Sequence, residues 1–444
     1  MLMDDKKTLA SCALVNRTFN LHTIPILYRS VSLTTPLTFT RFANATYCVT
    51  ERSSRIRHLD LSGFSTCGLQ KSSATTQNVV TPEILVNILM ATPGLEAFSV
   101  SETLESAITV EVLKTLLFNC RKIKALDFCG CSGKQFGIAM SELAEFMGRV
   151  KISLQFDEDG DDGEEVRYSF QKIAQPVLPQ LQRLSLHECP VISEHTAIIT
   201  MLAHAPNLTH LDLGGCSVSD MTLKFLTTET NVKHTLKHLL LAKCKNISSE
   251  AISNFVSQCH QLETLNIYGE RDIVTAIGEY DLITILNSPC AKRLQTLDIG
   301  SSQVTPRVLL AIQQNCSTSL RNLGISKAQI TSISHLSDFL MTMTHLRYID
   351  LTSIPCFNAF NTYGFITNLG KEHQLHTIEM SESLLKKLTT ANDWKIDENY
   401  GRRRYYFRST HEPRPDHVHS RKLDVTDCGP ERMSKIFQYY SFGK

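Results

Sequence analysis

Along most of the chain, apolar and polar positions alternate in a short recurring pattern, L-x-x-L-x-L, in which other apolar residues sometimes replace leucine. Eleven copies begin at Ile56, Leu95, Ile123, Leu181, Leu208, Leu236, Leu262, Leu294, Leu320, Leu346 and Leu375. From Leu181 onward, the copies follow one another at nearly regular intervals, as in a repeat architecture. Alternation over a few residues predicts a short strand in each copy. A weaker twelfth copy is predicted near Val150, and the wide spacings after Ile56 and Ile123 predict insertions there.

Between these strands, apolar residues recur at i, i+1, i+4 and i+5, which places them on one face of a helix. The Thr81-Pro82 and Thr305-Pro306 pairs predict helix starts, with threonine as the N-cap and proline at the first helical position. One strand and one helix in a unit of about 27 residues is typical of a leucine-rich repeat. We therefore predict an α/β leucine-rich-repeat solenoid over 56–383, a horseshoe with a parallel concave sheet and outer helices.

Seven of the 14 cysteines stand at matching places in the repeats. Four of them lie three residues after the last apolar position of a strand: Cys131, Cys189, Cys216 and Cys244. The other three lie three or four residues before the first apolar position of the next strand: Cys120, Cys259 and Cys316. This pattern resembles the cysteine-containing leucine-rich repeats, in which the thiol fills a buried slot. Zinc or redox sites need C-x-x-C pairs, and the chain has none, so we predict packing thiols without a metal or cofactor. Reduced thiols favour a cytoplasmic or nuclear protein.

The N-terminal residues differ from the repeats. Residues 9–19 fit an amphipathic helix, and residues 22–29 read as a second short segment broken by Pro25. The stretches 9–19 and 24–31 resemble the second half of an F-box of the form common in fungal proteins. F-boxes usually open with a Leu-Pro motif and an apolar first helix, whereas this sequence begins inside the following loop. We therefore predict a partial, α-helical F-box over 1–34.

The F-box resemblance implies a partner. In that family, the box packs on a Skp-type adaptor, which links it to a cullin and a ubiquitin-conjugating machine. The matching residues predicted to bind the adaptor are Leu9, Leu14, Val15, Phe19, Ile24, Pro25 and Tyr28. The alternative is that residues 9–31 form only the polar-outside cap that a solenoid needs at its end.

A second surface follows from strand alternation, which turns the residues beside the middle leucine toward the concave side. The predicted target-binding residues are His58, Asp60, Asp127, Arg183, His210, Asp212, His238, Asn266, Asp298, Tyr348, Asp350 and Glu379. Six of them are acidic, which predicts attraction of a target with a basic segment. Charge reversal at Asp212 and Asp298 is then expected to weaken target binding with little loss of stability. The alternative is that these carboxylates are merely solvated strand residues.

Two further segments lie outside the repeats. The acidic run 157–165 lacks the glycine and the final glutamate of a calcium loop, having Asp162 and Tyr168 there, and so favours a solvated insertion. The tail, 384–444, is predicted to be a capping extension. Within it, residues 394–396 and 405–407 suggest a hairpin that turns at 399–401.

Composition narrows the function. Forty-five basic residues balance 44 acidic ones, which argues against a nucleic-acid binder. The sequence shows no apolar run of membrane length and no secretory signal. It contains no Walker, G-x-S-x-G or H-E-x-x-H motif, so we predict a non-enzyme with no catalytic residues. The resemblance implies the substrate-recognition subunit of an SCF-type ubiquitin ligase. The alternative is a leucine-rich-repeat scaffold or a cell-cycle or GTPase regulator without a ligase role.

Overall fold

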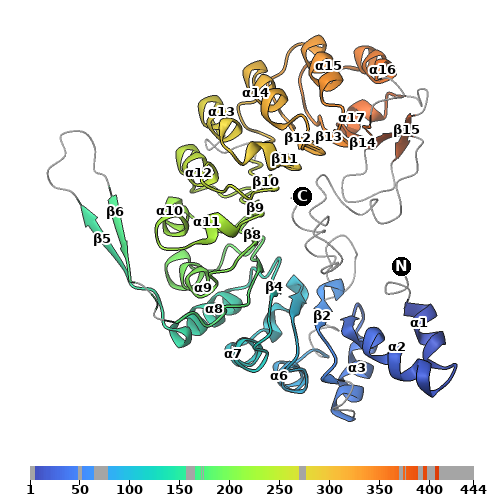
Figure 1. Cartoon of the computed structure of the whole chain (residues 1–444), viewed down its shortest axis with the longest axis vertical. Coiled ribbons are helices and arrows are strands. Elements are labelled where there is room, and N and C mark those ends of the chain that lie inside the picture. The colour runs from blue at the N-terminus through green and yellow to red at the C-terminus, as the bar shows by residue number, and fades with distance from the viewer. Residues whose placement is uncertain are drawn as a thin grey trace. The chain divides into compact units, whose positions relative to one another are not determined.

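The structure, a computed structural model, describes residues 6–48, 53–64, 79–156, 166–171, 173, 175–269, 277–369, 374–375, 377–388, 394–397 and 406–409. The chain divides after Leu208 into two units, which we describe separately. In both units, Figure 1 shows the helices on one side of the strands. The opposite side is called here the helix-free face.

The first unit, Met1–Leu208, alternates short strands with helices. Its elements are α1 (Lys6–Ala13), α2 (Arg17–Arg29), β1 (Ser30–Ser32), α3 (Pro36–Cys48), β2 (His58–Leu61), η1 (Ser62–Phe64), α6 (Pro82–Ala91), β3 (Ala97–Val100), η2 (Glu102–Ala107), α7 (Val110–Asn119), β4 (Ala125–Asp127), α8 (Lys134–Met147), β5 (Ile152–Phe156), β6 (Val166–Phe170), β7 (Arg183–Ser185), the π-helical turn η3 (Glu194–Ile198) and α9 (Ile199–His204). Strands β1, β2, β3, β4 and β7 pair in that order, all parallel.

Strand β1 adds a repeat that the leucine pattern missed. Ser30 pairs with His58 of β2, in the same parallel register as the other repeat strands. The corresponding apolar positions are Tyr28, Val31 and Leu33, and only the last of them is a leucine. The repeat sheet therefore begins inside the segment predicted to be the partial F-box.

The predicted twelfth copy near Val150 is wrong. Strand β5 pairs antiparallel with β6, from Ile152 with Phe170 to Phe156 with Val166, in a separate two-stranded sheet. Strand β4 instead pairs directly with β7. The segment is thus an inserted hairpin, which projects away from the repeats of the first unit in Figure 1. Its acidic run, 157–165, lies outside the described residues.

The second unit, Thr209–Lys444, continues the same alternation. Its elements are β8 (His210–Asp212), α10 (Asp220–Thr228), α11 (Val232–Thr235), β9 (His238–Leu240), α12 (Ser249–Val256), β10 (Thr264–Asn266), α13 (Glu279–Asn287), η4 (Ala291–Arg293), β11 (Thr296–Asp298), α14 (Pro306–Cys316), β12 (Asn322–Gly324), α15 (Ile333–Thr342), β13 (Tyr348–Asp350), α16 (Ala359–Asn368), β14 (Thr377–Glu379), α17 (Glu382–Leu385), β15 (Trp394–Asp397) and β16 (Tyr406–Ser409). Strands β8 to β14 pair in chain order and in parallel.

The predicted hairpin in the tail is confirmed. Strand β16 pairs antiparallel with β15, and it also pairs antiparallel with β14, the last repeat strand. Its predicted turn, 399–401, lies outside the described residues. Because β16 occupies the open edge of β14, the hairpin closes an edge that would otherwise be free to pair with another chain. The repeat sheet therefore runs on across the predicted domain boundary at residue 384.

The eleven predicted copies are confirmed as strands, and together with the helices they form leucine-rich repeats in both units. Their leucine positions are buried, as at Leu184, Leu211 and Leu297, because they point toward the helices. The predicted helix starts are also confirmed: the side chains of Thr81 and Thr305 accept hydrogen bonds from the third residue of their helices. Within each unit, the stacked repeats bury a continuous core that no single repeat could bury alone.

The repeat cysteines are packing residues, as predicted. All seven are buried and unbridged. The thiol of Cys189 donates to the carbonyl of Phe128 at 3.1 Å, and that of Cys244 donates to the carbonyl of Leu213 at 3.2 Å. Burial raises the pKa of Cys120 to about 11 and that of Cys316 to about 12. These thiols therefore stay protonated at neutral pH and are poor nucleophiles.

Candidate protein-interaction surfaces

The N-terminal segment folds as two helices joined by a tight turn. Helix α1 ends at Ala13 and α2 begins at Arg17. The break lies at Asn16, whose side chain accepts a hydrogen bond from the Phe19 amide at 2.9 Å and so caps α2. The predicted single helix over 9–19 is therefore wrong. The predicted break at Pro25 is also wrong, since Pro25 lies inside the continuous helix α2.

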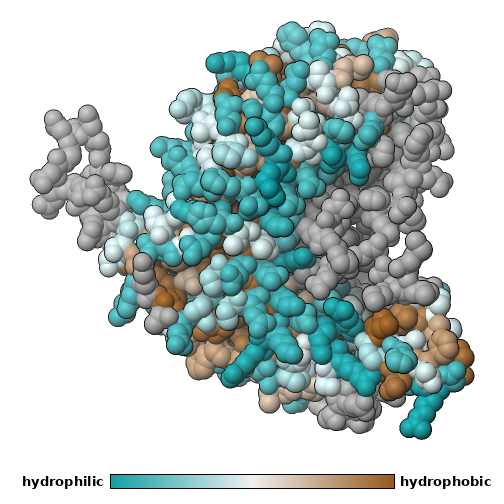
Figure 2. All heavy atoms as spheres, in the orientation of Figure 1, coloured by the Kyte–Doolittle hydropathy of each residue, from teal (hydrophilic) through white to brown (hydrophobic). Residues whose placement is uncertain are grey.

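Four large apolar side chains of this helix pair face solvent. Leu14 is 86% exposed, Val15 and Leu21 are each 63% exposed, and Phe19 is 49% exposed. We call these four residues the N-terminal apolar patch. In Figure 2, brown atoms gather over α1 and α2 at the lower right. Clustered apolar exposure of this kind is typical of interaction surfaces.

The predicted adaptor-binding residues divide into three groups. Leu14, Val15 and Phe19 belong to the patch, whereas Ile24, Pro25 and Tyr28 are half-buried in the second half of α2. Leu9 is buried within the helix pair, and its assignment to the surface is wrong. Leu21 was missed because the predicted helix ended at residue 19. Leu21 lies on α2, which continues from Arg17 to Arg29.

The strand residues of the helix-free face are much less accessible than expected. In the first unit, His58, Asp60 and Arg183 are half-buried and Asp127 is fully buried. The eight predicted target-binding residues of the second unit are all buried: His210, Asp212, His238, Asn266, Asp298, Tyr348, Asp350 and Glu379. The alternative of solvated carboxylates is therefore wrong for the buried ones.

Most of these acidic residues have a structural task that recurs from repeat to repeat. The third residue of the strand, which is its last residue except in β2, accepts through its side-chain oxygen a hydrogen bond from the backbone N–H two residues later. The donors are the amides of Ser62, Cys129, Gly214, Tyr268, Gly300 and Thr352, and the acceptors are Asp60, Asp127, Asp212, Asn266, Asp298 and Asp350, at 2.9 to 3.1 Å. Short polar side chains favour this local bond, which ends the strand and begins the turn.

Two of the predicted neighbours on this face do meet. His210 and His238 stack with ring centroids 4.0 Å apart and an angle of 15° between their planes, as their equivalent positions in adjacent repeats predicted. Farther along the same unit, the Tyr348 hydroxyl donates to Glu379. Among the described residues, no group of three His, Cys, Asp or Glu side chains is placed to hold a metal ion. The face is thus a network of buried polar contacts within the second unit.

Comparison with known proteins finds a similarity to a yeast F-box protein. No protein-family model matches it. It is 23% identical to the F-box protein YLR352W of Saccharomyces cerevisiae over 89% of its own length. It spans about half of that relative, 55% of its length.

Two solved structures resemble this chain weakly. One is the yeast complex of Rad7 and Elc1, at 12% identity and a TM-score of 0.38, covering 79% of this chain and 89% of that one. The other is a TLR13–ssRNA13 complex, at 12% identity and a TM-score of 0.25, covering 77% of this chain and 63% of that one. None of the helices that the structure describes has the length and apolar character of a membrane span.

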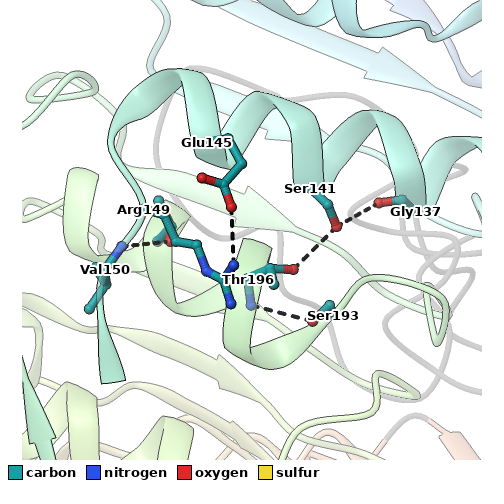
Figure 3. A network of polar contacts seen from close by, with 8 residues as sticks. Gly137, Ser141, Glu145, Arg149, Val150, Ser193 and Thr196 are labelled. Carbon is teal, nitrogen blue, oxygen red and sulfur yellow. Dashed lines mark hydrogen bonds and ion pairs between the residues drawn. The ribbon is translucent and has the colours of Figure 1, made fainter. Parts of the chain in front are cut away.

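In the first unit, the inserted hairpin is anchored at its base by a polar network (Figure 3). Ser141 of α8 donates to the Gly137 carbonyl at 3.1 Å and lies 3.2 Å from the Thr196 hydroxyl of η3. The amide of Val150, just before β5, donates to the Thr200 hydroxyl at 3.2 Å. Helix α8 is thereby joined to the segment 193–204.

His204 closes the network by holding both ends of the insertion. Its Nδ1 accepts a hydrogen bond from the Val177 amide at 3.2 Å, after β6, and its Nε2 lies 3.4 Å from the Gly148 carbonyl, before β5. Because Nδ1 is the acceptor, the ring is neutral and carries its proton on Nε2. Burial lowers the pKa of His204.

We expect this histidine to make stability pH-dependent. A lowered pKa in the folded protein means that the unfolded chain binds the proton first as the pH falls. The contribution of His204 is therefore intact at pH 7.5 and is lost as the pH falls from about 6.5 through the folded pKa. Urea unfolding at pH 7.5 and pH 5.5, together with hydrogen exchange at the Val177 amide, measures this loss.

The matched control is His195, which is exposed in the neighbouring turn η3. His204→Gln is expected to cost about 1–3 kcal/mol at pH 7.5, because it replaces a buried imidazole and leaves the Val177 amide poorly paired. His195→Gln is expected to cost under about 0.5 kcal/mol. If His204→Gln keeps the wild-type difference between the two pH values, the histidine is not the group that titrates.

Proposed function

We propose that the chain is the substrate-recognition subunit of an SCF-type ubiquitin ligase. The observation that carries this proposal is the N-terminal apolar patch, which α1 and α2 expose immediately before the first repeat strand. A solenoid cap needs a polar outer surface, so four exposed apolar side chains there are better explained by a partner. The similarity to a curated F-box protein supports the same function.

Within this proposal, the helix pair binds a Skp-type adaptor. Leu14 and Val15, in the turn, and Phe19 and Leu21, on α2, would be desolvated by the adaptor. Aromatic and aliphatic anchors that become fully buried contribute most of the affinity of such an interface. The half-buried Ile24, Pro25 and Tyr28 support the patch from the second half of α2. The adaptor would connect the chain to a cullin, so the chain itself needs no bond-making chemistry.

The target would bind the helix-free face of the repeats. The accessible part of the predicted target surface is in the first unit, where His58, Asp60 and Arg183 are half-buried. Asp60 also accepts a hydrogen bond from the Ser32 hydroxyl at 3.1 Å, which extends the polar surface to β1. A basic segment of a target would be attracted to Asp60. The buried, reduced thiols favour action in the cytosol or the nucleus.

Adaptor binding by the full chain tests this function. Leu14→Asp combined with Val15→Asp is expected to weaken binding of a purified Skp-type adaptor at least about tenfold, because two carboxylates would be desolvated at the interface. The control is Leu310→Asp on α14, an exposed leucine outside the patch, which is expected to bind like wild type. Isothermal titration calorimetry measures the affinities, and circular dichroism verifies the fold of each variant.

Two results would contradict the proposal. If the wild-type protein does not bind the adaptor, the proposed ligase role is wrong. Equal affinities of the wild type and the double variant place any adaptor contact outside the patch. Either result favours the alternative, a leucine-rich-repeat scaffold or a cell-cycle or GTPase regulator without a ligase role.

A further inference from the structure

Three exposed apolar residues form a row across the helices of the first unit. Met90 of α6, Phe118 of α7 and Phe146 of α8 are equally spaced in the sequence, one in each successive repeat helix. Their exposed fractions are 58%, 36% and 57%. We call these three residues the outer row. In Figure 2, tan and brown atoms gather over the region of α7 and α8.

Contacts between the helices hold the row together. The Asn119 side chain of α7 donates to the Leu89 carbonyl of α6 at 2.8 Å, which places the residues beside them, Phe118 and Met90, on neighbouring helix ends. The rings of Phe118 and Phe146 meet edge to face with centroids 5.0 Å apart. Lys114 of α7 lies over the Phe146 ring, with its Nζ 4.5 Å from the centroid. The row is therefore a preformed surface rather than three isolated side chains.

Apart from Lys114 over the Phe146 ring, the exposed charges beside the row differ in sign between its two sides. Arg121 and Lys122 follow α7, and Arg149 and Lys151 follow α8, so four exposed cations lie past the ends of these helices. Glu142 and Glu145 are exposed on α8 just before Phe146. One of the four cations, Arg149, forms an ion pair with Glu145 at 3.0 Å. Cations at helix C-termini also offset the helix dipole, but Lys122 and Lys151 lie beyond the last turn.

We propose that the outer row docks an amphipathic helix of a partner protein, with apolar residues at i, i+7 and i+14 and acidic residues along one edge. Packed helices lie about 8–10 Å apart. Seven residues of a helix span about 10.5 Å, so a helix laid across α6, α7 and α8 places one apolar residue beside each member of the row. Its acidic edge would meet the cations past α7 and α8.

The mixed signs of charge decide between a protein and a lipid partner. An anionic membrane would present negative charge to the whole surface, including Glu142 and Glu145. A helix with a single acidic edge matches the cations on one side of the row and avoids the glutamates on the other. The outer row is independent of the adaptor and target surfaces, because it lies on α6, α7 and α8.

A synthetic helical peptide of about three heptads tests this docking surface. It carries leucine at i, i+7 and i+14 and glutamate along one edge, and a sister peptide has lysine in place of each glutamate. Fluorescence anisotropy with the full chain measures both affinities at low and high salt. We expect the glutamate peptide to bind with a micromolar dissociation constant that rises with salt, and the lysine peptide to bind at least about tenfold more weakly.

Matched variants locate the binding. Phe118→Gln with Phe146→Gln, and separately Arg121→Glu with Lys122→Glu, are each expected to weaken the glutamate peptide about tenfold or more. The charge variant should also reduce the salt dependence. The controls are Phe360→Gln, an exposed phenylalanine on α16, and Lys292→Glu with Arg293→Glu, an exposed cation pair on η4. Both controls should bind like wild type.

Each contrary result overturns the proposal. No binding of the glutamate peptide at millimolar concentration, or equal binding of both peptides, removes the stated partner chemistry. Unchanged binding by both outer-row variants places the peptide elsewhere. Phe118- and Phe146-dependent binding to vesicles of phosphatidylserine and phosphatidylcholine, without peptide binding, identifies a lipid surface instead. Self-association that the phenylalanine variant abolishes identifies a second copy of this chain as the occupant.

Discussion

Replacing Asp298 by lysine is expected to destabilise the second unit by about 3–5 kcal/mol, enough to remove a large part of the stability of an ordinary domain. The carboxylate is buried, and its Oδ1 accepts the Gly300 amide at 3.1 Å. Lysine would leave that amide without its acceptor and place an ammonium group in a desolvated site. Urea unfolding followed by circular dichroism measures the change.

Two variants separate burial from the hydrogen bond. Asp298→Asn keeps an oxygen acceptor for the Gly300 amide. Its free energy of unfolding should fall by about 1 kcal/mol, the cost of one weakened hydrogen bond. Asp60→Lys removes the same strand-ending bond, from Ser62, at a half-buried position, and should cost about 1–2 kcal/mol. If Asp298→Lys costs no more than Asp60→Lys, burial is not what makes the position sensitive.

This expectation reverses the one from sequence, which held that charge reversal at Asp212 and Asp298 would leave stability nearly unchanged. Strand alternation predicts which residues point away from the helices. It carries no information about whether water reaches those residues, because burial depends on what else packs on that face. The recurrence of Asp at the end of the strand was itself a usable signal. Asp and Asn favour bonds to backbone two residues later, and a strand end followed by a turn is where such a bond forms.

The repeats were predictable because their signal is local and repeated. Each L-x-x-L-x-L copy specifies its own strand, and parallel stacking of equal units sets the register without further information. The same locality explains the two errors. Strand β1 was missed because Tyr28 and Val31 replace leucine, and only its pairing with β2 reveals it. Strand β5 fits the apolar alternation equally well, and its antiparallel partner, β6, was not recognised.

The N-terminal surface was predictable in composition but not in detail. Its apolar residues were identified from the F-box resemblance, and Leu14, Val15 and Phe19 are indeed exposed. A helical pattern alone did not show that the helix is interrupted before Asn16, which leaves Leu14 and Val15 in a turn, or that Leu9 is buried. An asparagine whose side chain accepts a hydrogen bond from the amide three residues later begins a new helix, and this bond competes with continuation of the preceding helix.

We expect the close packing of α8 on the segment 190–193 to require a glycine at position 137. A Cβ at Gly137 would lie 2.6 Å from the Val191 carbonyl oxygen, a backbone atom that no side-chain rotation can move. Gly137→Ala should therefore destabilise the first unit by about 1–3 kcal/mol, the usual cost of overpacking, even though alanine is the better helix former. It should also disturb the contacts from Ser141 of α8 to Thr196 and from Val150 to Thr200, which anchor the inserted hairpin.

Gly364 in α16 is the matched control, because a Cβ there meets nothing within 4 Å. Gly364→Ala should stabilise the protein by about 0.5–1 kcal/mol through helix propensity and loss of chain entropy on unfolding. The two substitutions are chemically identical and lie in helices of similar repeats, so opposite signs in urea unfolding isolate the close approach of Val191 as the cause. A stabilising Gly137→Ala would mean that the 190–193 segment moves away at little cost. In that case the packing of α8 on that segment does not fix the base of the hairpin, which is then held by His204, the Val150–Thr200 hydrogen bond and the pairing of β5 with β6.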